Sequence, residues 1–118
     1  MKRILITGAA SGLGLALAKK YASEGWSVCI ADIQDEEGIK VAAHLNEEYA
    51  NDCFFQHLDI TSDTQWQELV VLISERWQGL DALINNAGAG ASGDFDTFTI
   101  MYVKWVVVMN FLVVVKGC

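Results

Sequence analysis

A glycine-rich turn near the N-terminus constrains this chain more than any other feature of its sequence. The segment Thr7-Gly8-Ala9-Ala10-Ser11-Gly12-Leu13-Gly14 follows a short apolar run, and Leu13, Leu17 and Tyr21 then recur at helical spacing. Glycines let the backbone turn tightly and approach a pyrophosphate, and the N-terminus of the following helix offers unpaired N–H donors. The turn lacks the Gly-Lys-Ser/Thr ending of a P-loop, so a nucleoside triphosphate is not the expected ligand. Glycines also turn and cap in proteins that bind nothing, so the turn alone leaves a structural role open.

An acidic residue at the end of the second apolar run favours a dinucleotide. Residues 26–31 are apolar apart from Ser27, and Asp32 follows them 18 positions after Gly14. This is close to the spacing of about 20 residues at which an acid reaches the adenosine ribose of a bound dinucleotide. The alternatives for Asp32 are a solvated carboxylate at a strand end and a helix cap.

Short apolar runs alternate with segments of helical periodicity. Residues 3–7, 26–31, 53–58 and 80–85 predict strands, and helices are predicted before Gly25, over 35–49, and from a capping box at Ser62 and Gln65 to Gly79. Alternation of this kind implies parallel strands that are buried on both faces and joined by right-handed crossovers. We therefore expect an α/β fold: one domain, residues 1–118, holding part of a Rossmann-like doubly wound parallel sheet with strand order 3-2-1-4.

The last apolar element, residues 98–116, is ambiguous because its many valines favour a strand, whereas its length favours a helix. We expect a helix there. Residues 100–115 are too few for the roughly 20 that a spanning helix needs, and Lys104 and Asn110 interrupt them, which argues against a membrane segment.

Composition excludes several classes of function. Fifteen acidic residues against eight basic ones give a net charge of −7, and the basic residues form no stripe, which argues against nucleic-acid binding. The three cysteines lie far apart without metal-ligand spacing, so we expect no metal site and a reducing, cytoplasmic setting.

At this point the chain resembles the short-chain dehydrogenase/reductase family. The Thr-Gly-x-x-x-Gly-x-Gly spacing of residues 7–14 is that family's variant of the dinucleotide fingerprint. Three further motifs follow in order: Leu58-Asp59-Ile60, Asn85-Asn86-Ala87-Gly88, and residues 105–110, which end in Asn110. The resemblance covers residues 2–118, which is only about the first half of a family member.

The resemblance implies a role for each matching position. Ser11 and the backbone of Leu13 would hold the phosphate and ribose region, Asp32 would accept both ribose hydroxyls, and Asp59, with Ile60 beside it, would meet the adenine amino group. Asn85 would brace the sheet, and Asn110 would help to hold a water in the proton relay to the catalytic lysine. The implied cofactor-binding residues are Gly8, Ser11, Gly12, Leu13, Gly14, Asp32, Ile33, Asp59, Ile60, Asn86, Ala87 and Gly88.

Two of these positions leave a choice open. The alternative for Asp59 is a helix cap, because Thr61 and Ser62 follow it. The alternative for Asn110 is an amide that bonds to a neighbouring backbone group. Neither Ser11 nor Ile33 supplies a positive charge beside Asp32, so NAD(H) is expected in preference to NADP(H).

The chain departs from the family pattern at two points. Val113 stands where the family usually has a small residue, and no Tyr-x-x-x-Lys is present. The three tyrosines, Tyr21, Tyr49 and Tyr102, are followed at the fourth position by Gly25, Cys53 and Val106. Loss of a positioned acid or base typically costs about 10²–10⁴-fold in rate. We therefore expect the cofactor-binding half of an NAD(H)-dependent oxidoreductase of alcohols or ketones, truncated before its catalytic segment and inactive alone.

Two alternatives remain open at this stage. The same fold could serve as a non-catalytic nucleotide-binding or regulatory module, or the chain could be a truncated inactive product. In either case the edge of strand 80–85 and the valine-rich last element lead us to expect self-association.

Overall fold

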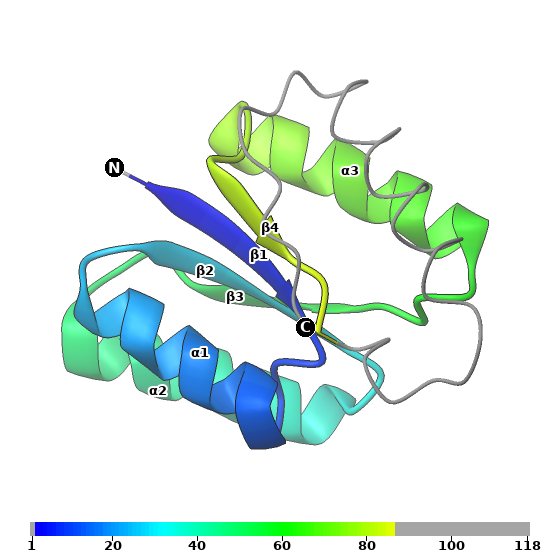
Figure 1. Cartoon of the computed structure of the whole chain (residues 1–118). Coiled ribbons are helices and arrows are strands. Elements are labelled where there is room, and N and C mark those ends of the chain that lie inside the picture. The colour runs from blue at the N-terminus through cyan, green and yellow to red at the C-terminus, as the bar shows by residue number, and fades with distance from the viewer. Residues whose placement is uncertain (1, 87–118) are drawn as a thin grey trace.

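The computed structural model describes residues 2–86, in which strands and helices alternate as expected. The last apolar element, and with it Ala87, Gly88 and Asn110, lies outside the described residues. The elements, in chain order, are β1 (Arg3–Thr7), α1 (Gly12–Ser23), β2 (Ser27–Asp32), α2 (Asp35–Tyr49), β3 (Phe54–His57), α3 (Asp63–Trp77) and β4 (Ala82–Ile84), as Figure 1 shows.

The four strands form one parallel sheet in the order β3-β2-β1-β4, which confirms the predicted topology. At the centre of the sheet, Ile4 of β1 pairs with Val28 of β2 on one side and with Ala82 of β4 on the other. Every residue of β2 is buried, as expected for a parallel strand that is covered on both faces.

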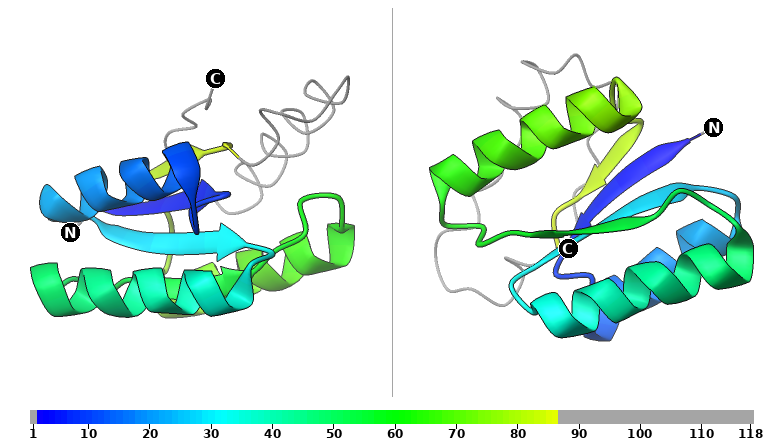
Figure 2. Two further views of the ribbon diagram at one scale, coloured as in Figure 1. Left: turned by 90° about the horizontal axis from the view of Figure 1, so that it is seen from below. Right: turned by 180° about the vertical axis from the view of Figure 1, so that it is seen from behind.

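Helices cover both faces of the sheet, and successive strand residues alternate between two apolar cores. Leu5 packs with Trp66 and Leu69 of α3, whereas Ile4 and Ile6 pack on the opposite face among residues of α1 and α2. Figure 2, in the view from behind, shows α1 and α2 side by side across the sheet from α3.

The two cysteines at 29 and 53 are small buried residues that belong to opposite cores. Cys29 packs on the α3 face and Cys53 on the face of α1 and α2. Burial raises the pKa of the Cys29 thiol, so this group stays protonated and unreactive.

Three expected strands differ from the observed ones at their ends. The second begins at Ser27 instead of Trp26 because the Trp26 N–H donates to the Tyr21 carbonyl oxygen at 3.0 Å and closes α1. The fourth covers only Ala82–Ile84, the residues that pair with β1, and the third covers only Phe54–His57. Leu80, outside the ladder, still packs in the core beneath α3.

The predicted capping box of α3 forms only in part. The Ser62 hydroxyl accepts from the Gln65 N–H at 3.2 Å, as predicted, but the Gln65 side chain accepts from the Asp59 N–H at 2.6 Å instead of from Ser62. The Ser62 N–H is already engaged, since it donates to the Asp59 carbonyl oxygen at 2.9 Å. The start of α3 is therefore tied to Asp59.

Within residues 2–86, none of the helices combines the length and the apolar character that crossing a bilayer requires.

Candidate functional site

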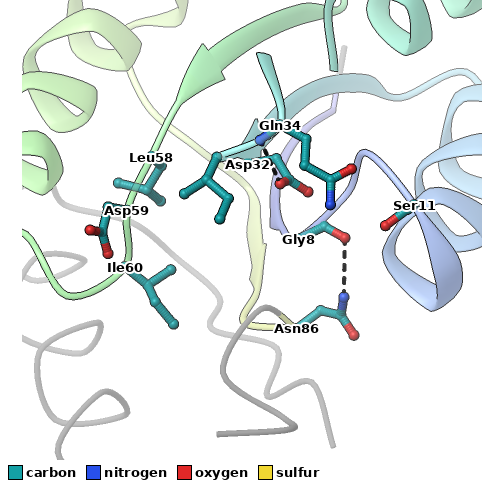
Figure 3. Close-up of a pocket in the computed structure, with 9 residues that line it drawn as sticks. Gly8, Ser11, Asp32, Gln34, Leu58, Asp59, Ile60 and Asn86 are labelled. Carbon is teal, nitrogen blue, oxygen red and sulfur yellow. Dashed lines mark hydrogen bonds between the residues drawn. The ribbon is translucent and has the colours of Figure 1, made fainter. Parts of the chain in front are cut away.

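A cavity of about 380 Å³ opens where the parallel strands end. Gly8 follows β1, Asp32 ends β2, and Asn86 lies just after β4, so distant parts of the sequence meet at one edge of the sheet. The chain passes from β1 outward to β2 and β3 and then returns to the other side of β1 for β4. Ligands of open α/β sheets bind at such a reversal, outside the carboxyl ends of the strands. Figure 3 shows the lining residues, which are Gly8, Ser11, Asp32, Ile33, Gln34, Leu58, Asp59, Ile60 and Asn86.

The glycine-rich turn contains two glycines in the left-handed region, of which Gly8 lines the cavity. Gly8 has φ 67° and Gly12 has φ 59°, a conformation that a Cβ disfavours. Ser11 is the N-cap of α1, but its side chain makes no capping hydrogen bond. Its hydroxyl and the free N–H groups of the first helical turn are therefore available to an anionic ligand at the N-terminus of α1.

Gly14 has a packing role. A Cβ at this position would overlap the carbonyl oxygen of Gly8 and would lie 2.8 Å from the side-chain nitrogen of Asn86. The absence of a side chain lets α1 pack directly on the end of β1, the role expected of the third glycine of a dinucleotide turn. Gly12, Leu13 and Gly14 form the beginning of α1 beside the cavity and are not among its lining residues, and the Leu13 side chain points to solvent.

Asp32 is buried, with 8% of its surface exposed, and each carboxylate oxygen accepts a backbone hydrogen bond. Oδ1 accepts from the Gln34 N–H and Oδ2 accepts from the Ala10 N–H, both at 3.0 Å. The N-cap of α2 is Gln34, so Asp32 is neither a solvated carboxylate nor the cap of that helix. A carboxylate offers about four acceptor sites, so each oxygen keeps capacity for a ligand hydroxyl.

Asp59 lines the cavity and also shapes the turn before α3. Its Oδ1 accepts from the Thr61 hydroxyl at 2.6 Å and from the Thr61 N–H at 2.9 Å. The Thr61 hydroxyl, assisted by the Thr61 N–H, holds the pKa of the Asp59 carboxyl below its ordinary value, so the group is ionised at neutral pH. The N-cap of α3 is Ser62, which leaves Asp59 outside the helix, with acceptor capacity toward the cavity.

A polar clasp ties the end of β4 to the glycine-rich turn. The Thr7 hydroxyl donates to Asn85 Oδ1 at 3.3 Å and accepts from the Asn86 N–H at 2.9 Å. The Asn86 side chain donates from Nδ2 to the Gly8 carbonyl oxygen at 3.3 Å. Asn85 is a buried member of this clasp and is absent from the cavity lining, which fits a bracing role, whereas Asn86 lines the cavity.

Gln34 is the lining residue that sequence reasoning did not single out. In Figure 3 its side-chain amide extends past the Asp32 carboxylate toward the turn that carries Gly8 and Ser11. The only sequence signal for it is its place two residues after Asp32, in the turn that leads into α2.

The cavity is acidic, because Asp32 and Asp59 are the only charged residues that line it within residues 2–86. Beside the lining residue Leu58, His57 Nδ1 lies 2.5 Å from Asp35 Oδ1 in a half-exposed pair. Across residues 2–86, no three His, Cys, Asp or Glu side chains come together as metal ligands.

Comparison with known proteins shows that this chain is similar in sequence and fold to oxidoreductases. A family model described as short chain dehydrogenase matches residues 2–118. The chain is 32% identical to an uncharacterized oxidoreductase of Bacillus subtilis (strain 168) over 112 residues, 94% of this chain and 16% of that protein. It is 34% identical to the 3-beta-hydroxysteroid dehydrogenase of Comamonas testosteroni over 96 residues, 81% of this chain and 36% of that protein. The chain thus spans well under half the length of these two relatives.

Solved structures share the fold. The L-sorbose reductase from Gluconobacter frateurii, complexed with NADPH and L-sorbose, superimposes with a TM-score of 0.81 at 24% identity, over 92% of this chain and 47% of that one. An oxidoreductase from E. coli superimposes with a TM-score of 0.78 at 25% identity, over 92% of this chain and 52% of that one.

Proposed function

The chain belongs to the short-chain dehydrogenase family, and from this membership we propose that it is the cofactor-binding part of an NAD(H)-dependent oxidoreductase of alcohols or ketones. The observation that carries the proposal is Asp32, a buried carboxylate fixed at the end of β2 and lining the cavity. A group held in this way can accept hydrogen bonds from two ribose hydroxyls without first being ordered.

The lining residues match the successive groups of a dinucleotide: the pyrophosphate, the ribose and the adenine. The pyrophosphate would lie against Gly8 and Ser11 at the N-terminus of α1, where unpaired N–H groups and the helix dipole favour an anion. The ribose hydroxyls would donate to Asp32, and the adenine would lie between Ile33 and Ile60. The adenine amino group would then donate to Asp59.

The nicotinamide end of the cofactor would lie toward the end of β4. Asn86 lines that side of the cavity, and Ala87 and Gly88 follow it as small residues that let a ribose approach the backbone. Gly12, Leu13 and Gly14 would contribute backbone at the start of α1. When bound, the nicotinamide supplies the hydride acceptor or donor.

Electrostatics favour NAD(H) over NADP(H) at this site. The 2′-phosphate of NADP(H) would face the Asp32 carboxylate, and none of the lining residues in the described part of the chain is basic. Two unit charges at ~4 Å with an effective dielectric near 20 repel by about 4 kcal/mol before screening. Even a third of this energy corresponds to about tenfold in affinity.

Calorimetric titration of the full chain with NADH and with NADPH tests the proposal. We expect the dissociation constant for NADH to be lower by about tenfold or more. Asp35→Asn serves as a control, because it removes one negative charge from a side chain that does not line the cavity. The preference of this variant for NADH over NADPH should equal that of the wild-type chain. Equal dissociation constants for the two cofactors would contradict the assignment of Asp32 to the ribose.

Catalysis by residues 1–118 alone is not expected. Asn110 would order a water in the proton relay, but the chain has no Tyr-x-x-x-Lys to transfer the proton. Of the tyrosines in the described part, Tyr21 lies in α1 and Tyr49 ends α2, and neither lines the cavity. Incubation with NADH and a panel of ketones should leave the absorbance of NADH constant. Turnover that disappears in Asn110→Ala would show a complete active site.

The partners and the setting follow from the same proposal. The substrate would be a small alcohol or ketone, met in the cytoplasm, with no role for nucleic acid or a membrane.

β4 pairs with β1 on one side and has no second strand partner within residues 2–86, so we also propose self-association through this edge. A sharp monomer peak in light scattering at micromolar concentration would contradict that part.

A further inference from the structure

The glycine-rich turn is fixed to the end of β2 at two points. Its middle residues, Ala9 and Ala10, are buried, so their backbone groups need partners within the protein. The Gly8 N–H donates to the Ala31 carbonyl oxygen at 2.7 Å, a backbone contact available to almost any sequence. The Ala10 N–H donates to Asp32 Oδ2 at 3.0 Å, a contact that requires this side chain.

The Asp32 carboxylate is held in place by its own neighbours, independently of the turn. Its carbonyl oxygen accepts from the Leu58 N–H at 3.0 Å, and its Oδ1 accepts from the Gln34 N–H at 3.0 Å. β2 pairs with strands on both sides, so the residue at its end has little freedom to move. Asp32 therefore presents a fixed, charged acceptor to Ala10, and charge-assisted hydrogen bonds are roughly twice as strong as neutral ones.

We propose that Asp32 is a positioning residue for the glycine-rich turn, in addition to its role as the ribose acceptor. The carboxylate that selects the ribose also holds the Ala10 N–H and, through it, the conformation in which the turn and the first turn of α1 meet the pyrophosphate. Ribose selection and phosphate binding thus depend on one side chain. This inference rests on the proposed function for the identity of the ligand but not for the contact itself.

A ligand without ribose hydroxyls separates the two roles by the sign of the effect. The probe is 2′,3′-dideoxyadenosine 5′-diphosphate, which keeps the diphosphate and the adenine but offers nothing to a ribose acceptor. If Asp32 acted only on the ribose, Asp32→Ala would leave the affinity for this probe unchanged or raise it, because a negative charge near the diphosphate is removed. A positioning role predicts the opposite, a loss of about tenfold, since the turn is no longer held.

Hydrogen exchange of the Ala10 amide tests the contact without any ligand. We expect this amide to exchange at least about tenfold faster in Asp32→Ala than in the wild-type chain, while the Ile4 and Ile30 amides in the sheet exchange as before. Asp35→Asn is the matched control, because it removes a neighbouring charge and leaves the Ala10 contact intact. If Asp32→Ala does not fold, Asp32→Leu keeps the branched shape of the side chain and also lacks an acceptor.

The outcomes separate this inference from the proposed function. A wild-type chain that binds neither NADH nor the dideoxy probe would overturn the proposed function, and Ala10 exchange would still decide the inference. A wild-type chain that binds both, together with an Asp32→Ala variant that binds the probe equally well or better, would overturn the positioning role. Unchanged Ala10 exchange, or an equal acceleration of the Ile4 and Ile30 amides, would overturn it as well.

Discussion

Two helical glycines lie against other parts of the chain, but only Gly14 faces backbone. A Cβ at Gly14 would overlap the Gly8 carbonyl oxygen, whereas a Cβ at Gly38 would meet the ring of the half-buried Phe55. The Gly8 carbonyl belongs to a turn fixed by hydrogen bonds, while an aromatic ring can rotate away. The two sites therefore differ in their tolerance of alanine, although both would gain helix propensity.

We predict that Gly14→Ala lowers the free energy of unfolding by about 2 kcal/mol, because overpacking typically costs about 1–3 kcal/mol. Gly38→Ala, its matched control, should change that free energy by less than about 1 kcal/mol, since the gain in helix propensity offsets the shift of Phe55. Urea unfolding of both variants measures the difference. Equal losses of unfolding free energy in the two variants would show that the backbone at Gly8 shifts as readily as the Phe55 side chain.

Asp52 ties the loop before β3 to the end of α3. Its Oδ1 accepts from Arg76 at 2.6 Å, and its Oδ2 accepts from the indole N–H of Trp77 at 2.9 Å. The hydrogen bond from Arg76, with a further contribution from Trp77, lowers the pKa of Asp52 below its ordinary value of 3.8. Because the folded pKa is depressed, the resulting stabilisation is fully present above 3.8 and is lost as the pH falls through the folded value.

We predict that the stability advantage of the wild-type chain over Asp52→Asn, present at about pH 6, shrinks as the pH falls below 3.8 and through the folded pKa of Asp52. Arg76→Gln removes the principal cause of the shift and should show the same weakened dependence on pH. The measurement is the urea midpoint of the three proteins across this range. A constant gap between wild type and Asp52→Asn would mean that the native contacts do not depress the pKa.

The sequence allowed most of the cavity residues to be predicted, but on two different grounds. Gly8 and Asp32 were predicted from the glycine-rich turn and its spacing to the acid, Asp59 and Asn86 from the resemblance to the family, and all four line the cavity. The contact between Asp32 and Ala10 could not be predicted, because it depends on where two segments 22 residues apart come to lie. Gln34 was missed for a similar reason, since only the turn direction brings its amide toward the cavity.

At the scale of the element, α1 and α3 differ in how their N-termini are capped. Ser62 accepts from the Gln65 N–H at the start of α3, whereas Ser11 makes no side-chain capping bond at the start of α1. We predict that Ser62→Ala lowers the free energy of unfolding by about 1 kcal/mol. Ser11→Ala should change it by only a few tenths, because no capping bond is lost. Thermal or urea unfolding compares the two, and equal losses would contradict the difference in capping.

The elements themselves were predicted well where their signal is local, and less well where it is not. The periodicity of α2 and α3 is contained within each helix, and their predicted positions are confirmed. The start of the second strand and the reciprocal half of the capping box depend on which acceptor a particular backbone N–H bonds to. The Trp26 N–H bonds to α1 and the Ser62 N–H bonds to Asp59, and neither competition is visible in the sequence.

At the scale of the whole molecule, the residues of the candidate binding site and the residues that stabilise the fold lie at opposite ends of the sheet. The carboxyl ends of the strands carry Asp32, Asp59 and the glycine-rich turn, while ties such as that of Arg3 to Asp81 lie at the opposite end. The strand order was predicted from the Rossmann-like fold that the alternating elements indicate, because the crossover rule fixes only the hand of each connection. The same topology implies that a ligand affects one end of the molecule and leaves the other unchanged.

The most direct test is therefore to map NADH onto the isotopically labelled full chain by NMR. We predict that backbone amide shifts concentrate at residues 8–15, 32–34 and 58–61, with the Asp52 and Asp81 amides unchanged. The same titration of Asp32→Ala should give much smaller shifts at equal concentrations. Shifts centred on Asp52 and Asp81, or an absence of shifts at saturating NADH, would contradict the assignment of the carboxyl edge of the sheet as a cofactor site.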